Sequence, residues 1–363
     1  MMKKLIPLLF IVVILVSCKK ENDNIIWERS LGQGRAYFVT ATADSGILSC
    51  GVLTARPYLV KFNRNKSIET SYSSDNEGLF SAAWSDTACF ITAGSEGGKM
   101  LLSRISMTGN KVWDTTLTAS FHLDITSLID EGGGKFLAVG SASPDSSANG
   151  LTTLLFVRFD TAGQITKKLE ITSLGFLASR NAVEDHLGNI YLGLTKRADN
   201  QKSKAAVAKY NNDVQKLWET DLYNNTDFTA ESNDVTADTE GNVYVTGKTE
   251  ASKMTGTLDN SFLAKIDRTG ETVWKKYLEN ANSGTAIVLL GSEGLAMLNR
   301  NCFIIRKAAS ADGSDEGTIR MFNACDSYIT DAFGSDLSLS HDGNYLTAGS
   351  SGGNFYVAVK SSQ

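Results

Sequence analysis

The sequence is poor in proline, poor in histidine and without an excess of basic residues. Of 363 residues only 3 are Pro and 3 are His, and 35 Lys and Arg stand against 40 Asp and Glu. A net charge of -5 argues against the basic surface that neutralises a nucleic-acid backbone. We therefore expect no nucleic-acid partner.

Recognisable catalytic motifs are also missing. The sequence has no HExxH, no GxSxG and no glycine-rich phosphate loop. His186 and His341 fall in the same turn of a repeated segment, where a solvated turn residue is more common than a catalytic base. The acidic run at residues 311–317, ADGSDEG, lacks the ligand order of an EF-hand loop and is typical of a hairpin turn. We expect no catalytic residue, no metal site and no cofactor.

One apolar run stands out, at the N-terminus. Lys3 and Lys4 precede twelve largely apolar residues, 5–16, which are too few to cross a bilayer as a helix. The run ends in LVSC, which resembles the lipobox of bacterial lipoproteins, where the cysteine is lipidated and becomes the first residue. We predict a signal peptide over 1–17, a lipid on Cys18 and a polar tether completing 18–24.

The tether suggests a location. The segment KEND at 20–23 resembles the signal that sends some Gram-negative lipoproteins to the cell surface, although a plain solvated tether has similar composition. We expect an outer-membrane lipoprotein that is attached to the membrane through its lipid and faces the periplasm or the outside. We expect the protein to be a monomer.

Glycine is abundant, with 32 residues, and recurs inside a repeated phrase. EGNVYVTGKT at 240–249 returns as HLGNIYLGLT at 186–195 and HDGNYLTAGS at 341–350, with looser copies elsewhere. Gly188 and Gly241 are 53 positions apart. A period of about 50 residues is typical of propeller blades with four strands.

A second phrase repeats with the same period. FLAKIDRTGETVWKKYL at 262–278 shares its plan with 101–117, 155–169 and 206–222: a strand, a turn built on Asp or Asn and usually Gly, and a strand often carrying Trp. The strands are apolar on both faces, as in blades that stack against each other. A β-solenoid, the rival architecture, has shorter rungs. We predict an all-β, seven-bladed β-propeller with four antiparallel strands in each blade.

The two ends of the chain fit together in this fold. The last repeat stops after its third strand, and NIIWERSLG at 24–32 matches the outer-strand phrase. The first strand is therefore expected to complete the last blade, which removes two exposed sheet edges. Residues 25–363 then form a single domain. We expect the seven inner strands to begin near Ala36, Leu79, Leu123, Ser179, Glu231, Thr285 and Thr330.

The two phrases resemble the repeat of the bacterial seven-bladed β-propeller repeat (SBBP) family over roughly residues 25–361. The elements Asp267 to Trp274 and Gly109 to Trp113 are also similar to the tryptophan-docking element of quinoprotein-like propellers, which include quinone-dependent dehydrogenases. The resemblance implies the fold. It implies no particular activity, because propellers carry many unrelated functions.

Non-repeated loops are the first candidate binding site. The connections between second and third strands are longest at 142–150, 196–204 and 250–260, and the connection at 223–231 adjoins them. Loops on a rigid scaffold commonly carry binding residues, although neutral surface variation is the alternative for any one of them. The residues that we single out are Arg197, Lys204, Tyr223, Phe228 and Lys253.

Polar residues in the inner strands are the second candidate. Asn181, Asp234 and Asp336 hold matching positions, four before the turn that follows. They are expected to point toward the channel mouth, where they could bind a cation or a sugar. Capping of strand ends is the structural alternative.

The remaining cysteines leave one question open. A hairpin near residue 312 would bring Cys302 and Cys325 together, so that a disulfide in an oxidising periplasm and two buried free thiols are both consistent with the sequence. Cys50 and Cys89 are expected to be core thiols.

Two classes of function follow. The first is a lipid-anchored, non-catalytic module that binds an envelope protein or a glycan. The alternative is an envelope enzyme of the quinoprotein-like or polysaccharide-degrading type, with its site at the channel mouth. Clustered carboxyls with perturbed pKa would favour the enzyme, and exposed aromatic faces without them would favour binding.

Overall fold

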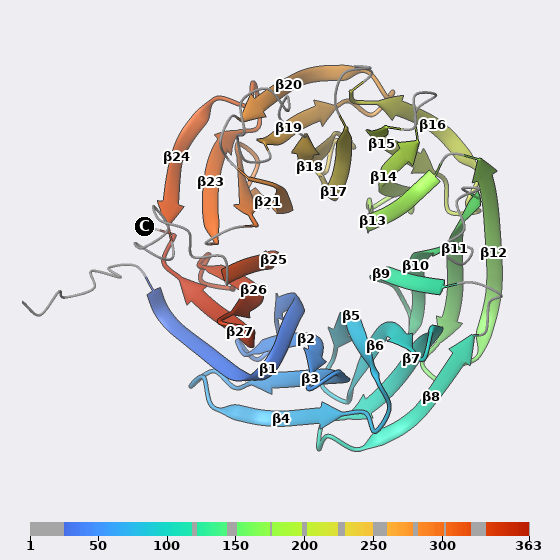
Figure 1. Cartoon of the computed structure of the whole chain (residues 1–363), viewed down its shortest axis with the longest axis vertical. Helices are drawn as coiled ribbons and strands as arrows, with labels where there is room; N and C mark the ends of the chain where they lie inside the picture. Colours follow the sequence, from blue (N-terminus) through green and yellow to red (C-terminus); the bar gives the residue numbers. More distant parts are fainter. Residues whose placement is uncertain are drawn as a thin grey trace, which may run out of the picture.

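The chain folds into a ring of antiparallel sheets around a central axis (Figure 1). The structure is a computed structural model, and it describes residues 25–117, 122–143, 151–174, 176–197, 202–223, 229–249, 260–278, 282–300, 303–320 and 332–362. These residues form 27 strands. Five sheets have four strands each, and the sixth has seven.

Four strands form each blade, numbered from the channel outward. Blade 1 contains the second half of β1 (Ile25–Ala41), β2 (Ile47–Leu53), β3 (Arg56–Phe62) and β4 (Ile68–Ser73). Blade 2 contains β5 (Gly78–Ser85), β6 (Cys89–Glu96), β7 (Lys99–Ser106) and β8 (Lys111–Leu117). Blade 3 contains β9 (His122–Gly132), β10 (Lys135–Ser143), β11 (Leu151–Asp160) and β12 (Ile165–Leu174).

The remaining blades follow the same plan. Blade 4 contains β13 (Phe176–Glu184), β14 (Ile190–Arg197), β15 (Ser203–Tyr210) and β16 (Lys216–Asp221). Blade 5 contains β17 (Ala230–Ala237), β18 (Val243–Thr249), β19 (Asn260–Ile266) and β20 (Thr272–Leu278). Blade 6 contains β21 (Gly284–Leu290), β22 (Gly294–Asn299), β23 (Ile304–Ala309) and β24 (Asp315–Arg320). Blade 7 contains β25 (Ala332–Leu339), β26 (Tyr345–Ser351), β27 (Asn354–Lys360) and the first half of β1.

The seven-stranded sheet closes the ring. The first half of β1 pairs with β27, from Ile25 opposite Lys360 to Gln33 opposite Asn354. Its second half pairs with β2. The predicted closure is therefore confirmed, but outer and inner strand are one continuous element rather than two. A register shift between Ser30 and Gln33 accompanies the passage from blade 7 to blade 1.

Hydrophobic cores lie between neighbouring blades. Tryptophans on the outer strands connect each of three blades to the next. The indole of Trp218 in blade 4 donates to the Arg268 carbonyl of blade 5 at 3.1 Å, and its ring covers Gly270, where a Cβ would lie 3.0 Å from the ring. Two further pairs follow the same plan: Trp113 with the Thr161 carbonyl at 3.0 Å, and Trp274 with the Ser310 carbonyl at 3.3 Å. The repeated Trp and turn glycine thus join consecutive blades.

The first repeated phrase encodes the turn between the first two strands. The Oδ1 atom of Asp238 accepts the backbone N–H groups of Glu240 and Asn242, and the Asn242 amide and the buried Tyr244 hydroxyl donate to Oδ2. Gly241 supplies the positive φ of 83° that this tight turn requires. Asp185 makes the same bonds in blade 4.

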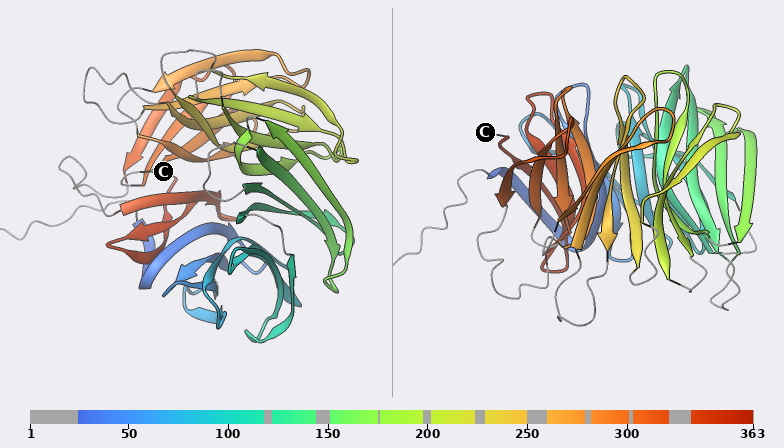
Figure 2. Two further views of the ribbon diagram at one scale, coloured as in Figure 1. Left: turned by 45° about the vertical axis from the view of Figure 1, so that its right-hand side comes forward. Right: turned by 90° about the horizontal axis from the view of Figure 1, so that it is seen from above.

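The two faces of the ring differ in the connections that they carry. In an antiparallel blade, the turn from first to second strand and the turn from third to fourth strand lie at the same end. The connections from second to third strand and from blade to blade begin and end at the opposite face, which we call the loop face; Figure 2 shows the ring edge-on.

Candidate functional site

Every inner strand departs from regular pairing at the same height in the channel. The register shifts lie between Ala36 and Phe38 in β1, and at the corresponding positions of β5, β9, β13, β17, β21 and β25. A bulge of this kind re-aims the side chain of the extra residue. The skipped residues that line the channel are all polar: Tyr37, Ser81, Thr126, Asn181, Asn233, Thr285 and Ser335.

A repeated glycine on the second strand makes room for the bulge. Gly94 pairs with Phe80, and a Cβ on Gly94 would lie 2.1 Å from the carbonyl oxygen of Leu79. Gly51, Gly247 and Gly349 meet inner-strand carbonyls at 1.9 to 2.1 Å in the same way. The second glycine of the first phrase is therefore required for close backbone approach, whereas the first, such as Gly241, is required for a positive φ.

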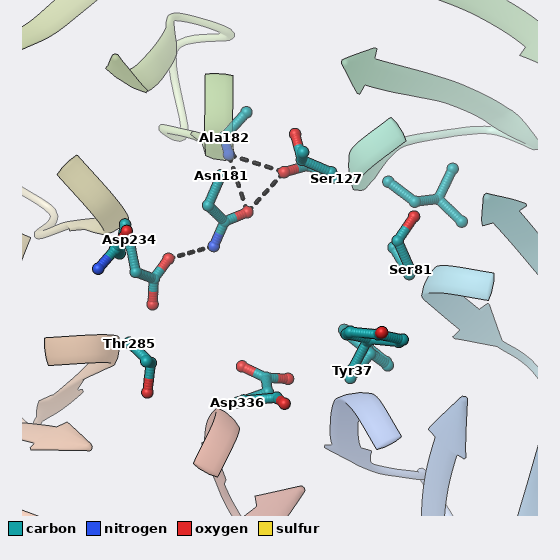
Figure 3. A pocket seen from close by; sticks show the side chains of 14 residues that line it. Tyr37, Ser81, Ser127, Asn181, Ala182, Asp234, Thr285 and Asp336 are labelled. Atoms are coloured by element: carbon teal, nitrogen blue, oxygen red, sulfur yellow. Dashed lines mark hydrogen bonds between the residues drawn. The ribbon is translucent and has the colours of Figure 1, made fainter. Parts of the chain in front are cut away.

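The bulged side chains surround a cavity of about 280 Å³ on the ring axis (Figure 3). All seven inner strands contribute to its wall. Because each blade supplies a hydroxyl, an amide or a phenol here, the cavity offers hydrogen-bonding groups from every direction. The sequence predicted three of its lining residues and did not predict the ring as a whole.

Asn181, Asp234 and Asp336, the predicted channel residues, line this cavity and also join neighbouring blades. The Asp234 carboxyl accepts the backbone N–H of Ile287 in blade 6 at 2.7 Å, the N–H of Val235 and the amide of Asn181. The Asp336 carboxyl accepts the N–H of Val39 in blade 1 at 2.8 Å. These hydrogen bonds connect consecutive blades. Figure 3 shows both carboxyls at the edge of the cavity.

Burial perturbs both carboxyls. Desolvation raises the pKa of Asp234 to about 7, while the donors from Asn181 and from Ile287 and Val235 act in the opposite direction. Desolvation raises the pKa of Asp336 to about 7 as well, and the charge of Asp234 adds to the rise. Two channel carboxyls therefore titrate near neutral pH, although each is held by backbone amides.

A second cavity, of about 370 Å³, forms the mouth of the channel on the loop face. It shares Tyr37, Ser81 and Thr126 with the inner cavity and adds charged residues near the ends of the strands. The charged residues are Arg35, Glu231, Lys248 and Arg300. None of the four was singled out from the sequence as a site residue, because the repeated phrases define turns and strands and do not show which strand ends meet at the mouth.

The predicted loop residues are only partly described. The loop expected at 196–204 is shorter, because Lys196 pairs with Lys204 and Arg197 with Ser203 in the β14–β15 ladder. Lys204 Nζ lies 2.7 Å from Asp221 Oδ2, so its charge is compensated within blade 4. Phe228 and Lys253 lie outside the described residues, as does the side chain of Arg197.

Tyr223 is a packing residue between blades 4 and 5. Its ring lies 5.0 Å from that of Phe262, measured between centroids, and Lys275 Nζ lies 4.3 Å from the ring centroid. Burial raises the pKa of the Tyr223 hydroxyl. The aromatic face that the sequence suggested for a ligand is thus covered on at least one side by neighbouring residues.

The structure describes two of the five cysteines. Cys50 and Cys89 are buried free thiols, as predicted. Cys18, Cys302 and Cys325 lie outside the described residues. Within the described part of the chain, no group of three His, Cys, Asp or Glu side chains is arranged to hold a metal ion, and no helix has the length and apolarity to cross a membrane.

Comparison with known proteins supports the architecture. Residues 229–252 match the family described as Beta-propeller repeat, and no curated protein matches the chain. Among solved structures, the WD40 beta-propeller domain of Doa1 is 13% identical, with a TM-score of 0.60 over 94% of this chain and 97% of that one. A protein of unknown function from Bacteroides caccae is 12% identical, with a TM-score of 0.48 over 85% and 98%. At 13% identity the likeness to the Doa1 domain concerns the fold alone.

Proposed function

We propose that this protein is a lipid-anchored module of the bacterial cell envelope that binds a polar ligand, a glycan or a protein segment, at the loop-face mouth of its channel without chemical turnover. The observation that carries the proposal is the ring of bulged polar side chains. Seven blades place hydrogen-bonding groups around one cavity that continues into a wider mouth. A site with convergent polar groups on a rigid scaffold is typical of ligand binding.

The lipid anchor in this proposal is inferred from the sequence. The charged start, the short apolar run and Cys18 at its end agree with a lipoprotein signal. The first described strand, β1, begins at Ile25 on the outside of blade 7. A tether that leads to the outer rim would leave the channel open to ligands.

An enzyme is the second candidate, because of one specific observation. The pKa of Asp234 and of Asp336 is raised to about 7, and carboxyls with raised pKa serve as general acids in glycoside hydrolysis. Both carboxyls, however, accept hydrogen bonds from backbone amides of the next blade, which is an adequate structural reason for their presence. We therefore place binding first.

Anchoring is tested in the cells that make the protein. Metabolic labelling with palmitate should label the wild type and not Cys18→Ala, and the wild type should sediment with membranes. Protease shaving of intact cells then shows which side of the outer membrane the domain faces. A wild-type chain that takes up no lipid would overturn the anchored form of the proposal.

Ligand binding is tested by crosslinking pull-down from intact cells. The wild type is compared with a variant whose channel is plugged by a larger side chain. Thr285 lines both cavities, so Thr285→Trp should fill the passage. Val112, which is 56% exposed on the outer strand β8, provides the control Val112→Trp. One component recovered by the wild type and the control but not by Thr285→Trp supports the proposal. Equal recovery by all three places the interaction elsewhere. Conversion of the recovered component, abolished by Asp234→Asn, would favour the enzyme.

A further inference from the structure

Two arginines from distant parts of the chain meet at the channel mouth. Arg35 lies on β1 in blade 1, Arg300 follows β22 in blade 6, and blade 7 stands between them. Arg35 Nε donates to Ser335 Oγ at 2.8 Å, and the Arg300 guanidinium carbon lies 5.4 Å from the centroid of the Phe333 ring. Both contacts are with β25, which therefore holds the two side chains on one wall of the mouth.

The two arginines have no acidic ion-pair partner among the residues that the structure describes, although Glu231 also lines the mouth. Glu231 is paired with Lys248 at 3.3 Å. Burial is the main cause that lowers the pKa of Arg35, and the charge of Arg300 contributes in the same direction, while Tyr37 opposes it. The two cations are thus close enough to repel, and an anion between them would relieve that repulsion.

We propose that this arginine pair binds the carboxylate of an acidic oligosaccharide, such as one built from uronic acids. Guanidinium groups bind carboxylates through paired, charge-assisted hydrogen bonds. The mouth volume of about 370 Å³ lies in the range of small-molecule pockets, about 300 to 1,000 Å³. The inference deepens the proposed function and rests on it in placing the ligand at the mouth.

The rest of the lining favours a sugar over an acidic peptide. Among the described residues that line the mouth, only Ile125 is aliphatic, whereas peptide anchors usually fill apolar pockets. The hydroxyls of Ser81, Thr126 and Thr285 donate to backbone carbonyls. Their oxygens can still accept hydrogen bonds, and sugar hydroxyls are donors that suit them.

The experiment is calorimetric titration of the full chain with trigalacturonate, its methyl ester and hexaglutamate. Arg300 is exposed, so Arg300→Gln should fold normally, and Arg35→Gln is the second variant. Arg56 provides the matched control: it is exposed at the β2–β3 turn on the same face and does not line the mouth. Arg56→Gln therefore removes the same charge from the same face. Thermal unfolding of each variant checks the fold.

The expected result is binding of trigalacturonate that weakens at least about tenfold in Arg300→Gln and Arg35→Gln, as for loss of a charge-assisted bond. Binding should persist in Arg56→Gln and weaken with salt. Equal affinity for the methyl ester overturns the anion site but leaves channel binding intact. Preference for hexaglutamate overturns the sugar assignment. Absence of binding to all three probes overturns the inference, whereas the plugged-channel pull-down tests the proposed function independently.

Discussion

The buried carboxyl of Asp234 should make the stability of the protein fall as pH rises from 4 to 7. Its pKa is raised from 3.8 to about 7 by desolvation. Between these values the native state holds a proton that the unfolded state has released, so the stabilising contribution is complete below pH 4 and is lost as pH rises through 7. The perturbation that tests this is Asp234→Asn, which cannot ionise.

The size of the effect follows from the two pKa values. A rise from 3.8 to about 7 corresponds to roughly 4 kcal/mol of unfolding free energy between pH 4 and pH 8. Asp336 should add a similar slope, because its pKa is also raised to about 7. Carboxyls with a lowered pKa act elsewhere: the hydrogen bond from Lys61 is the main cause that lowers the pKa of Asp44 to about 2, so its effect lies below pH 4.

Urea unfolding at a series of pH values measures the slope. Asp234→Asn should be less stable than the wild type at pH 4, since the Ile287 N–H loses its oxygen acceptor if the amide nitrogen faces it. Its stability should nevertheless depend less on pH between 4 and 7. The control is Asp75→Asn, an exposed carboxylate outside the channel. A wild type whose stability rises across this interval, or equal slopes in wild type and Asp234→Asn, would refute the reasoning.

Three further predictions concern the architecture. Gly94→Ala should lower the free energy of unfolding by about 2 kcal/mol or more, because its Cβ would lie 2.1 Å from the Leu79 carbonyl oxygen. Gly32→Ala is the control, because its Cβ would lie 3.6 Å from the nearest atom. Urea unfolding should show little change of stability in this control. Trp218→Phe should lower the free energy of unfolding by about 1 kcal/mol, because it removes the 3.1 Å hydrogen bond to the Arg268 carbonyl. Thermal unfolding should show a larger loss of stability in Trp218→Phe than in Trp84→Phe. Equal losses would count against tryptophan docking. Deletion of residues 25–31 should expose the β27 edge and cause aggregation in light scattering, while a soluble monomer would contradict closure by β1.

Much of the fold was predictable because it repeats. Asp238, Gly241 and Trp274 each act within a few residues or on the next blade, so their spacing in the sequence reports directly on a turn or a contact. Closure was predictable for the same reason, since residues 24–32 match an outer-strand phrase. The continuity of β1 was not, because nothing in the phrase marks where one blade yields to the next.

The site was less predictable because it depends on single-residue shifts and distant segments. The bulge turns Thr285 and Ser335 toward the channel, and a one-residue irregularity leaves little trace in an alternating pattern. Arg35 and Arg300 are separated by most of the chain and meet only because the ring closes. Lys204 was assigned to a loop, but the hairpin ladder extends to it and Asp221 pairs with it.

Photo-crosslinking in intact cells tests the central claim, that the channel mouth holds the ligand. Para-azidophenylalanine in place of Tyr37 puts the reactive group in the channel with little change of size, because the azide replaces the hydroxyl and Tyr37 lines both cavities. The same group in place of Tyr277, which is 43% exposed on the outer strand β20, samples the rim. We expect an envelope component joined to position 37 and not to position 277. Adducts at position 277 alone, or equally at both, would contradict the account.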